Sequence, residues 1–339
     1  MKKVLLYILL AVIILALGAA GYGYYVLNTG FSTNKKVYLY IDENKDYNTL
    51  RQALIDSARI ENISNFDLLS QVLDYKDNIK TGRYEVAPDM NLYELINTLR
   101  RGQQAPVKLK FNNIRTKEDL AERLSDQLMI SRVSILNALN NSEVYEKLGF
   151  NKETIVAMFI PNTYEVYWDT SLDSFISRMK KEYDSFWNES RREKARNIGL
   201  SLTDVSILAS IVEEECMYAD EYPIVAGLYI NRLNKGMLLQ ADPTVKFANG
   251  DFSLRRILHK HLVIDSPYNT YKHTGLPPGP IRIPSIKGID AVLSYKKHDY
   301  LYMCAKEDFS GYHNFAKTHA EHQQNAMKYQ RALNIRGIY

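Results

Sequence analysis

Three consecutive glutamates that follow an apolar run, within residues 203–216, have the clearest chemical potential in the chain. Carboxyl groups act as general acids and bases when their pKa lies near the working pH. If the segment is helical, at about 100° per residue, its apolar side chains gather into one stripe, made of Val205, Ile207, Leu208, Ile211 and Val212. Glu215 falls on that stripe, Glu213 opposite it and Glu214 at its margin. The sequence therefore predicts three environments for three adjacent carboxylates.

Glu215 is the predicted catalytic residue. A carboxyl group pressed against an apolar face loses hydration, which raises its pKa and lets it keep a proton near neutral pH. The alternative is that the helix frays after Val212 and that the glutamates form a solvated last turn. The geometry leaves both readings open, although an unpaired buried carboxylate is costly and seldom occurs without a function.

Two polar and aromatic segments follow, at residues 239–244 and 266–271, and they precede a glycine- and proline-rich loop at 275–280. Such segments suit a groove that hydrogen-bonds sugar hydroxyls and stacks on sugar rings. Taken singly, each is also typical of a turn, with Asp242 or Thr244 capping the next helix.

The elements that must position these residues alternate between strands and helices. A small module over residues 36–105 is predicted from a strand with alternating polarity, a turn that leads into a second strand, and two helical runs, the second ending before Gly102. These elements lie at 37–41, 50–60, 80–86 and 92–99.

The longer part of the chain, residues 106–339, is predicted to form a mixed domain. After a strand candidate at 107–111, Thr116 and Asp119 form a capping box, and helical periodicity continues with short breaks to residue 196. Thr203 and Asp204 open the glutamate-bearing helix, and the helix after it stops at Gly236.

Beyond residue 236 we expect short strands, the 275–280 loop and a last helix over about 319–333. The predicted fold class is therefore α+β, with a helical part at 112–235 and a loop-rich, cleft-forming part at 236–339.

The N-terminus predicts a membrane anchor. Lys2 and Lys3 precede an uncharged run over 4–27, and a helix of that length reaches about 36 Å, enough to cross a hydrocarbon core of about 30 Å. The positive charges place residues 1–3 in the cytoplasm and the rest of the chain outside the cytoplasmic membrane. A cleaved signal peptide is the alternative, because residues 18–20 are small, but the apolar run is longer than a typical signal core.

Composition excludes several classes of protein. The 339 residues are 46% hydrophobic and 24% charged, which excludes disordered, collagen-like and disulfide-scaffold chains. The net charge of +4, with interspersed signs, gives no argument for a nucleic-acid partner. Cys216 and Cys304 allow at most one disulfide, whose formation the sequence leaves open. His319 and His322 beside Glu321 lack the spacing of zinc proteases, so no metal site is predicted.

Taken in order, the motifs resemble the endolytic murein transglycosylases of the MltG (YceG-like) type. The resemblance covers nearly the whole chain and rests on Lys-Thr-Gly-Arg-Tyr at 80–84, Pro-Asn-Thr-Tyr at 161–164, Leu-Ala-Ser-Ile-Val-Glu-Glu-Glu at 208–215, Ile-Asn-Arg-Leu at 230–233, Leu-Gln-Ala-Asp-Pro-Thr-Val at 239–245, Tyr-Asn-Thr-Tyr at 268–271 and Gly-Leu-Pro-Pro-Gly at 275–279.

This resemblance implies a membrane-anchored enzyme that cuts peptidoglycan strands internally between MurNAc and GlcNAc and leaves a 1,6-anhydro-MurNAc end. It implies a LysM-like module at 36–105, no cofactor, and cell-wall synthases as partners. Glu215 would serve as acid and then as base, in agreement with the helical-face argument. The expected substrate-binding residues are Gln240, Asp242, Thr244, Asn269 and Tyr271. The family's glutamate precedes a small hydroxyl residue, whereas Cys216 follows it here, and a thiol is a weaker hydrogen-bond donor.

Two other functions stay open. A glycoside hydrolase needs a second carboxyl about 5 to 9 Å from the first, and Glu221 or Asp242 are the candidates. A membrane-tethered, wall-binding scaffold would use the LysM-like module alone and need no catalytic glutamate. The product separates the two reactions, because an anhydro end is one water lighter than a hydrolysed one.

Overall fold

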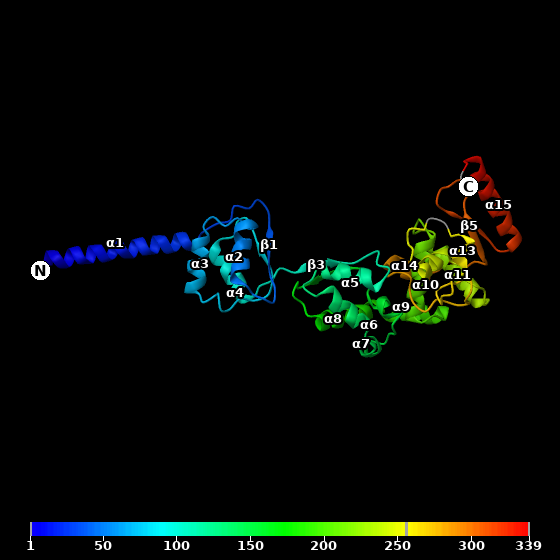
Figure 1. Ribbon diagram of the computed structural model, residues 1–339, viewed down its shortest axis with the longest axis horizontal. Helices are drawn as coiled ribbons and strands as arrows, with labels where there is room; N and C mark the ends of the chain where they lie inside the picture. The colour runs from blue at the N-terminus through cyan, green and yellow to red at the C-terminus, as the bar shows by residue number, and fades with distance from the viewer. Residues whose placement is uncertain (1, 255–256, 338–339) are drawn as a thin grey trace. The chain divides into compact units, whose positions relative to one another are not determined.

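The computed structural model describes residues 2–254 and 257–337 of the chain. Met1, in the expected cytoplasmic tip, and residues 338–339, in the expected catalytic domain, lie outside the described residues. Helices predominate, and the strands form two-stranded sheets (Figure 1). The mixed helix-and-strand fold class is therefore confirmed. The chain divides into two compact units, the first over residues 1–109, 127–130 and 164–170 and the second over 110–126, 131–163 and 171–339.

The first unit begins with α1, Lys2–Leu27, whose side chains are mostly exposed. By length and composition α1 could cross a membrane, a test that a signal sequence near an N-terminus also passes. Its last turn belongs to the folded unit, because Val26 packs in the core and Thr29 accepts a hydrogen bond of 2.7 Å from Asn65.

The remainder of the first unit packs helices around a small antiparallel sheet. Strands β1 and β2 pair with Leu39 opposite Tyr84, both buried. The elements are β1 (Val37–Ile41), α2 (Tyr47–Asp56), α3 (Ile63–Val72), β2 (Gly82–Val86) and α4 (Leu92–Arg101), followed by β3 (Val107–Lys110), which pairs with β4 (Thr163–Val166). The predicted strand at 37–41 and the helix stop at Gly102, which is left-handed, are confirmed. The helical run expected to reach residue 60 ends at Asp56 instead.

Helices form the first part of the second unit, and the capping box of Thr116 and Asp119 is confirmed there. Its core contains buried aromatic side chains such as Phe159, Phe175 and Trp187. The elements are α5 (Lys117–Ser125), α6 (Arg132–Asn140), α7 (Ser142–Lys147), the 3-10 helix η1 (Ile155–Met158), α8 (Leu172–Phe186) and α9 (Glu189–Ile198).

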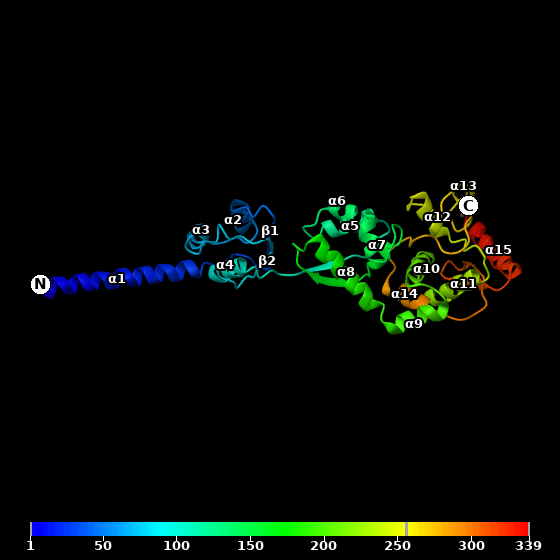
Figure 2. The same ribbon diagram turned by 90° about the horizontal axis from the view of Figure 1, so that it is seen from below.

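The rest of the second unit is built around helix α10, which carries the three glutamates (Figure 2). The elements are α10 (Leu202–Glu215), α11 (Tyr222–Asn234), α12 (Asp242–Asn249), α13 (His259–Leu262), α14 (Ile286–Leu293), β5 (Tyr302–Ala305), β6 (His313–Ala316) and α15 (His319–Ile335). The short strands expected beyond residue 236 are present as β5 and β6, and in the described residues they follow α12, α13 and α14.

Helix α10 differs from its prediction in two ways. Its N-cap is Ser201, which forms the capping box with Asp204, so the helix begins before Thr203. It also contacts α9, α11, α12, α14 and η1, and every residue from 205 to 213 is buried. A helix enclosed on all sides has no exposed face, and the single apolar stripe was therefore a poor guide to the position of Glu213.

Candidate active site

Glu215, the last residue of α10, lines a cavity of about 400 Å³ in the second unit. Helix α11 contributes Leu228, Tyr229 and Arg232 to the wall of this cavity. The loop before α12, Tyr271, the β5–β6 pair and the start of α15 form the rest of the wall. The polar side chains among the lining residues are Glu215, Tyr229, Arg232, Gln240, Asp242, Tyr271, Tyr302, Cys304, His313, His319 and His322. A carboxyl in such a cavity is accessible to a ligand while protein atoms surround it on its other sides.

The electrostatic environment of Glu215 keeps its proton near neutral pH. Burial raises the pKa of Glu215 from 4.5 to about 7, and the negative charge of Asp242 acts in the same direction. The hydroxyl of Tyr229 donates a hydrogen bond of 2.8 Å to Oε1, which opposes this rise in pKa. Near pH 7 both the acid and the carboxylate form of Glu215 are populated, as a group that first donates and then accepts a proton requires.

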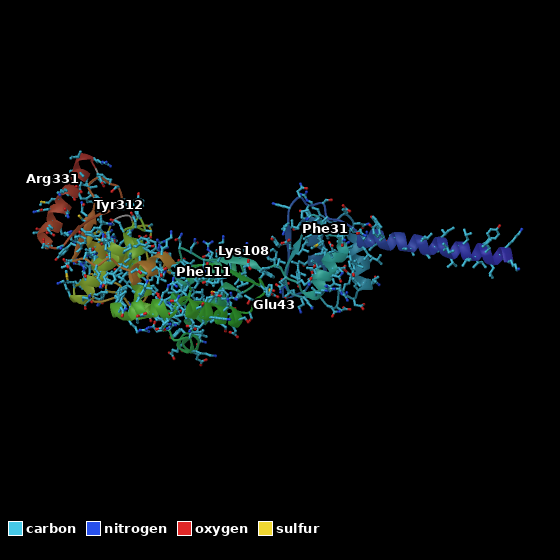
Figure 3. All side chains as sticks on the ribbon, turned by 180° about the vertical axis from the view of Figure 1, so that it is seen from behind. Phe31, Glu43, Lys108, Phe111, Tyr312 and Arg331 are labelled. Atoms are coloured by element: carbon cyan, nitrogen blue, oxygen red, sulfur yellow. The ribbon has the colours of Figure 1, made fainter. Side chains whose placement is uncertain are left out.

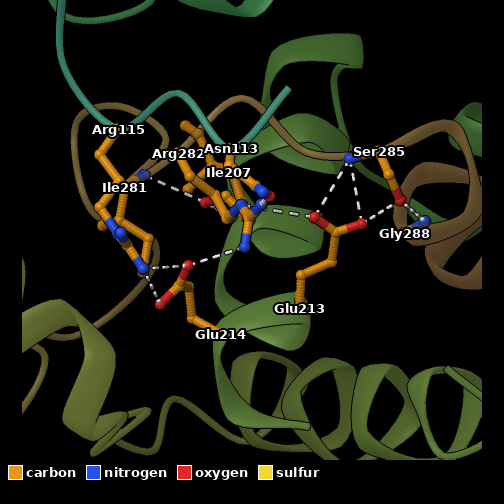
Figure 4. A network of polar contacts seen from close by, with 10 residues as sticks. Asn113, Arg115, Ile207, Glu213, Glu214, Ile281, Arg282, Ser285 and Gly288 are labelled. Atoms are coloured by element: carbon orange, nitrogen blue, oxygen red, sulfur yellow. Dashed lines mark hydrogen bonds and ion pairs between the residues drawn. The ribbon is translucent and has the colours of Figure 1, made fainter. Parts of the chain in front are cut away.

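Glu213 has a structural role (Figure 4). Its carboxylate accepts hydrogen bonds from the Ser285 backbone N–H, at 3.0 and 3.1 Å, and from the Ser285 hydroxyl. Ser285 is the N-cap of α14, so the charge of Glu213 lies at the positive end of that helix dipole. Only 8% of Glu213 is exposed, which makes it the most buried of the three glutamates, contrary to its predicted position opposite the apolar stripe.

A glycine lets the Glu213 carboxylate approach α14 so closely. A Cβ atom at Gly288 would lie 2.6 Å from Glu213 Oε1, so no larger residue fits at this position without a shift.

Glu214 is neutralised by two arginines (Figure 4). Arg115 Nη2 lies 3.1 Å and Arg282 Nη1 2.8 Å from Glu214 Oε1, and Arg282 Nη2 also donates to Asn113 at 2.8 Å. Among the residues that the structure describes, no arginine, lysine or histidine forms an ion pair with Glu215. Of the three neighbouring carboxylates, Glu215 alone combines a hydroxyl partner, a cavity and a raised pKa.

Three of the predicted substrate-binding residues lie in the same cavity as Glu215. Gln240, Asp242 and Tyr271 all contribute to its wall. The Tyr271 hydroxyl donates a hydrogen bond of 2.6 Å to Asp242 Oδ1, so the two side chains form one polar group. Gln240 has a left-handed backbone, with φ of 52°, and its N–H donates to the carbonyl of Thr270 at 3.1 Å. The two sequence segments predicted to form a groove are thus joined at the cavity.

The other two predicted residues, Thr244 and Asn269, are fully buried behind the cavity wall. The Thr244 hydroxyl donates to the carbonyl of Ala241 at 2.7 Å and bonds the Thr270 hydroxyl at 2.8 Å. Asn269 donates to the carbonyls of Leu262 and Ile264 and accepts from the Tyr271 N–H at 3.0 Å. Both side chains therefore hold the loops that carry Asp242 and Tyr271. Neither Asp242 nor Thr244 caps α12, whose N-cap is Ala241.

Two further cavity residues, which were not among the predicted site residues, act through their neighbours. Tyr229 and Arg232 lie on α11, which the sequence presents as scaffold. Arg232 donates to three backbone carbonyls, those of Leu301 at 2.7 Å, Leu239 at 2.6 Å and Leu238 at 3.1 Å. This guanidinium thus joins the loop before α12 to the segment before β5, and both segments line the cavity.

Glu221 is engaged in a buried contact with His313. Its carboxylate accepts from the His313 backbone N–H and lies 2.9 Å from His313 Nδ1. His313 itself lines the cavity. The contact fixes the imidazole ring and uses both oxygens of Glu221, which is therefore poorly suited to serve as a second catalytic carboxylate.

Both cysteines are free thiols in this structure. Cys216 is the buried C-cap residue of α10, and burial raises the pKa of its thiol. Cys304 lines the cavity from β5.

Comparison with known proteins relates most of the chain to one family. The family model described as the YceG-like family matches residues 39–328, a range that includes every cavity residue named above. The "Endolytic murein transglycosylase" of Bacillus subtilis (strain 168) is 35% identical over 221 residues, which are 63% of this chain and 58% of that protein. The protein of the same name from Streptococcus pneumoniae (strain ATCC BAA-255 / R6) is 25% identical over 352 residues, covering 92% of this chain and 63% of that protein.

The chain thus spans about three fifths of the length of these two relatives. A crystal structure titled as a yceG-like protein from Listeria monocytogenes is 29% identical, with a TM-score of 0.56, and the match covers 86% of this chain and 99% of that one.

Proposed function

Because the chain belongs to the YceG-like family, we propose that it is an endolytic peptidoglycan lytic transglycosylase. It cleaves the bond between MurNAc and GlcNAc within glycan strands and leaves a 1,6-anhydro-MurNAc end. The observation that carries this proposal is the state of Glu215, a carboxyl with a pKa of about 7 that lines a cavity and has a tyrosine hydroxyl as its hydrogen-bond donor.

In the proposed reaction one carboxyl serves both proton transfers. Protonated Glu215 donates its proton to the glycosidic oxygen as the bond from C1 of MurNAc breaks. The carboxylate then accepts the proton of the C6 hydroxyl as that oxygen bonds to C1, which returns Glu215 to its acid form without consuming water. The hydrogen bond from Tyr229 to Oε1 leaves Oε2 to face the substrate.

The polar group around Glu215 supplies the substrate contacts in this proposal. Gln240, Asp242 and Tyr271 bind hydroxyl and acetamido groups of the sugars, since all three line the cavity. Thr244 and Asn269 act on the substrate only indirectly, by holding the loops that carry these side chains.

The second candidate is a glycoside hydrolase, and one observation favours it: Asp242 shares the cavity with Glu215. In that reaction Asp242 would be the nucleophile or would activate water, and the product would gain the oxygen of a water molecule. Replacement of Asp242 by asparagine separates the two. A hydrolase would lose turnover, whereas a transglycosylase keeps forming anhydro ends with weaker substrate binding.

The N-terminal elements support a membrane location. We propose that α1 is a single-pass anchor in the cytoplasmic membrane, with residues 1–3 in the cytoplasm and the two units on the outer side. Residues 36–105, which form the small sheet and helices of the first unit, would be the LysM-like module that holds glycan. Residues 106–339 would be the catalytic domain, with its helical part at 112–235 and its cleft-forming part at 236–339. Cell-wall synthases are the proposed protein partners, by analogy with the family.

Mass spectrometry of muropeptides tests the proposed reaction. The full chain in detergent is incubated with purified glycan strands, alongside Glu215→Gln and, as a matched control, Glu193→Gln, which makes the same change at an exposed residue of α9. We expect anhydro ends from the parent and the control and none from Glu215→Gln. Incorporation of heavy oxygen from labelled water would favour the hydrolase. Equal binding of strands without cleavage by all three proteins would favour the wall-binding scaffold.

A further inference from the structure

Two tyrosine rings form a partly exposed stack on the loops that follow α10 and precede β6. Tyr218 and Tyr312 lie with ring centroids 4.6 Å apart and ring planes 22° from parallel. Tyr218 is 40% exposed, and its neighbour Met217 is 71% exposed. Tyr312 lies at the edge of the second unit, where its side chain is labelled in Figure 3. We call this pair the Tyr218–Tyr312 platform. A contiguous exposed apolar patch is a candidate binding surface, and here Met217 and the stacked rings lie together.

Several contacts hold the platform in place. The Tyr312 hydroxyl donates a hydrogen bond of 3.1 Å to Asp220, which lies on the same loop as Tyr218. Gly311 has a φ of 85°, and a Cβ atom there would lie 2.6 Å from Met217 Sδ and 3.2 Å from Tyr218 Cε2. The turn before β6 thus favours glycine for its left-handed backbone conformation, and Met217 and Tyr218 pack against it. The stack is therefore fixed by the loops on both sides and does not depend on two freely moving side chains.

The platform is carried by the two loops that also hold Glu215 and His313 in the cavity wall. Tyr218 follows Glu215 by three residues, and Tyr312 directly precedes His313, which lines the cavity. The buried contact between Glu221 and His313 ties the two loops together at the same place. A glycan strand that leaves the cavity on the His313 side would pass close to the two tyrosines.

We propose that the Tyr218–Tyr312 platform is a sugar-binding subsite, which stacks on the apolar face of an N-acetylhexosamine ring of the glycan strand outside the cleaved pair. The inference rests on the proposed function and adds a substrate contact to it. An enzyme that cuts inside a strand has sugars on both sides of the bond, and these lie beyond the catalytic cavity. Aromatic rings bind the C–H face of a pyranose by apolar contact, and the hydroxyl at the ring edge can meet water or sugar hydroxyls.

Binding is measured first, in the full chain carrying Glu215→Gln so that strands are not cut. Tyr218→Ala removes the ring, and Tyr218→Phe is the matched control that keeps it. We expect Tyr218→Ala to weaken binding of purified glycan strands about three- to tenfold, the range that stacking of one aromatic ring supplies, and Tyr218→Phe to bind as its parent does. Thermal melting of each variant establishes that the fold is kept.

Cleavage is measured second, with Glu215 in place. We expect Tyr218→Ala to raise KM for strands by the same three- to tenfold range with kcat little changed, and to alter the lengths of the products. Unchanged binding and KM in Tyr218→Ala would overturn the subsite, as would an equal loss in both Tyr218 variants. The two proposals fail separately: absence of anhydro ends from the parent chain refutes the transglycosylase, whereas the binding comparison decides on the platform even then.

Discussion

Replacing Tyr229 by phenylalanine removes the hydrogen bond of 2.8 Å that its hydroxyl donates to Glu215 and leaves the ring in place. That bond favours the carboxylate form of Glu215 and so lowers its pKa, against the larger effect of burial. A hydrogen bond to a charged group contributes about 1.5 to 3 kcal/mol, and one to a neutral group about 1 kcal/mol. The difference between these two hydrogen-bond energies stabilises the carboxylate form over the acid form, and about 1.4 kcal/mol of such stabilisation corresponds to one pKa unit. We therefore expect the pKa of Glu215 to rise by about one unit in this variant.

The assay is the pH dependence of kcat/KM on purified glycan strands, whose alkaline limb reports the proton on the free enzyme's acid. We expect that limb near pH 7 in the parent chain and about one unit higher in Tyr229→Phe. The control is Tyr222→Phe, the same change on the same helix at a half-buried ring, which should leave the limb unmoved. A lower overall rate in Tyr229→Phe does not matter to this test. A limb that stays in place or moves to lower pH would refute the assignment of Glu215 as the acid.

Three further predictions concern the glutamates and their neighbour Cys216. Folding raises the pKa of Glu215 from 4.5 to about 7, so between these pH values the native state binds more protons than the unfolded state, and the parent chain loses at most about 3 kcal/mol of stability as the pH rises through this interval. Thermal melting at a series of pH values should show this loss in the parent chain and not in Glu215→Gln. The same pH dependence of melting in both proteins would contradict the prediction. Glu213→Ala leaves the Ser285 N–H at the start of α14 without its acceptor and should destabilise the fold by about 3 kcal/mol. Denaturant unfolding measures this loss, with Glu193→Ala as the control. Equal unfolding midpoints for the two variants would contradict a structural role of Glu213. Cys216→Ser supplies the hydroxyl of the family pattern in place of a thiol that is buried and free. We expect kcat/KM to change by less than about threefold. A tenfold gain in kcat/KM would mean that a hydroxyl at this position orients Glu215.

Local signals in the sequence predicted much of the fold. The capping box at Thr116, the left-handed stop at Gly102 and the strand at 37–41 depend on residues within a few positions of one another, and the structure has them as expected. The segment after residue 236 lacks such clear signals. It forms short helices, among them α12, which ends at the left-handed Gly250, and α14, which begins at the Ser285 N-cap, before the expected short strands appear as β5 and β6.

In the candidate site, too, some features could be predicted from local sequence signals and others depend on the packing of distant segments. Glu215, Gln240, Asp242 and Tyr271 could be selected from their sequence motifs, and they line one cavity. The hydrogen bond from Tyr229 and the contact of Glu221 with His313 could not be predicted from the sequence. Each joins two segments whose relative position depends on the packing of α10, α11 and β6. Thr244 and Asn269 were selected by the same motifs, yet their side chains bond the loops from behind. A motif therefore marks the segment and does not say which of its side chains face the cavity.

The difference between the three glutamates arises from where their counter-charges come from. A carboxylate at the C-terminal end of a helix is disfavoured by the helix dipole, so each of the three needs compensation to ionise. Glu213 receives it from the N-terminus of α14 and from Arg282, whose Nε lies 3.6 Å from Glu213 Oε2, and Glu214 receives it from Arg115 and Arg282. Both sources reach α10 from segments distant in the sequence, and neither forms a hydrogen bond or ion pair with Glu215 in the described residues. In the proposed reaction Glu215 differs from its neighbours in its partners, because a fully compensated carboxylate at position 215 would be ionised at neutral pH and would have no proton to donate.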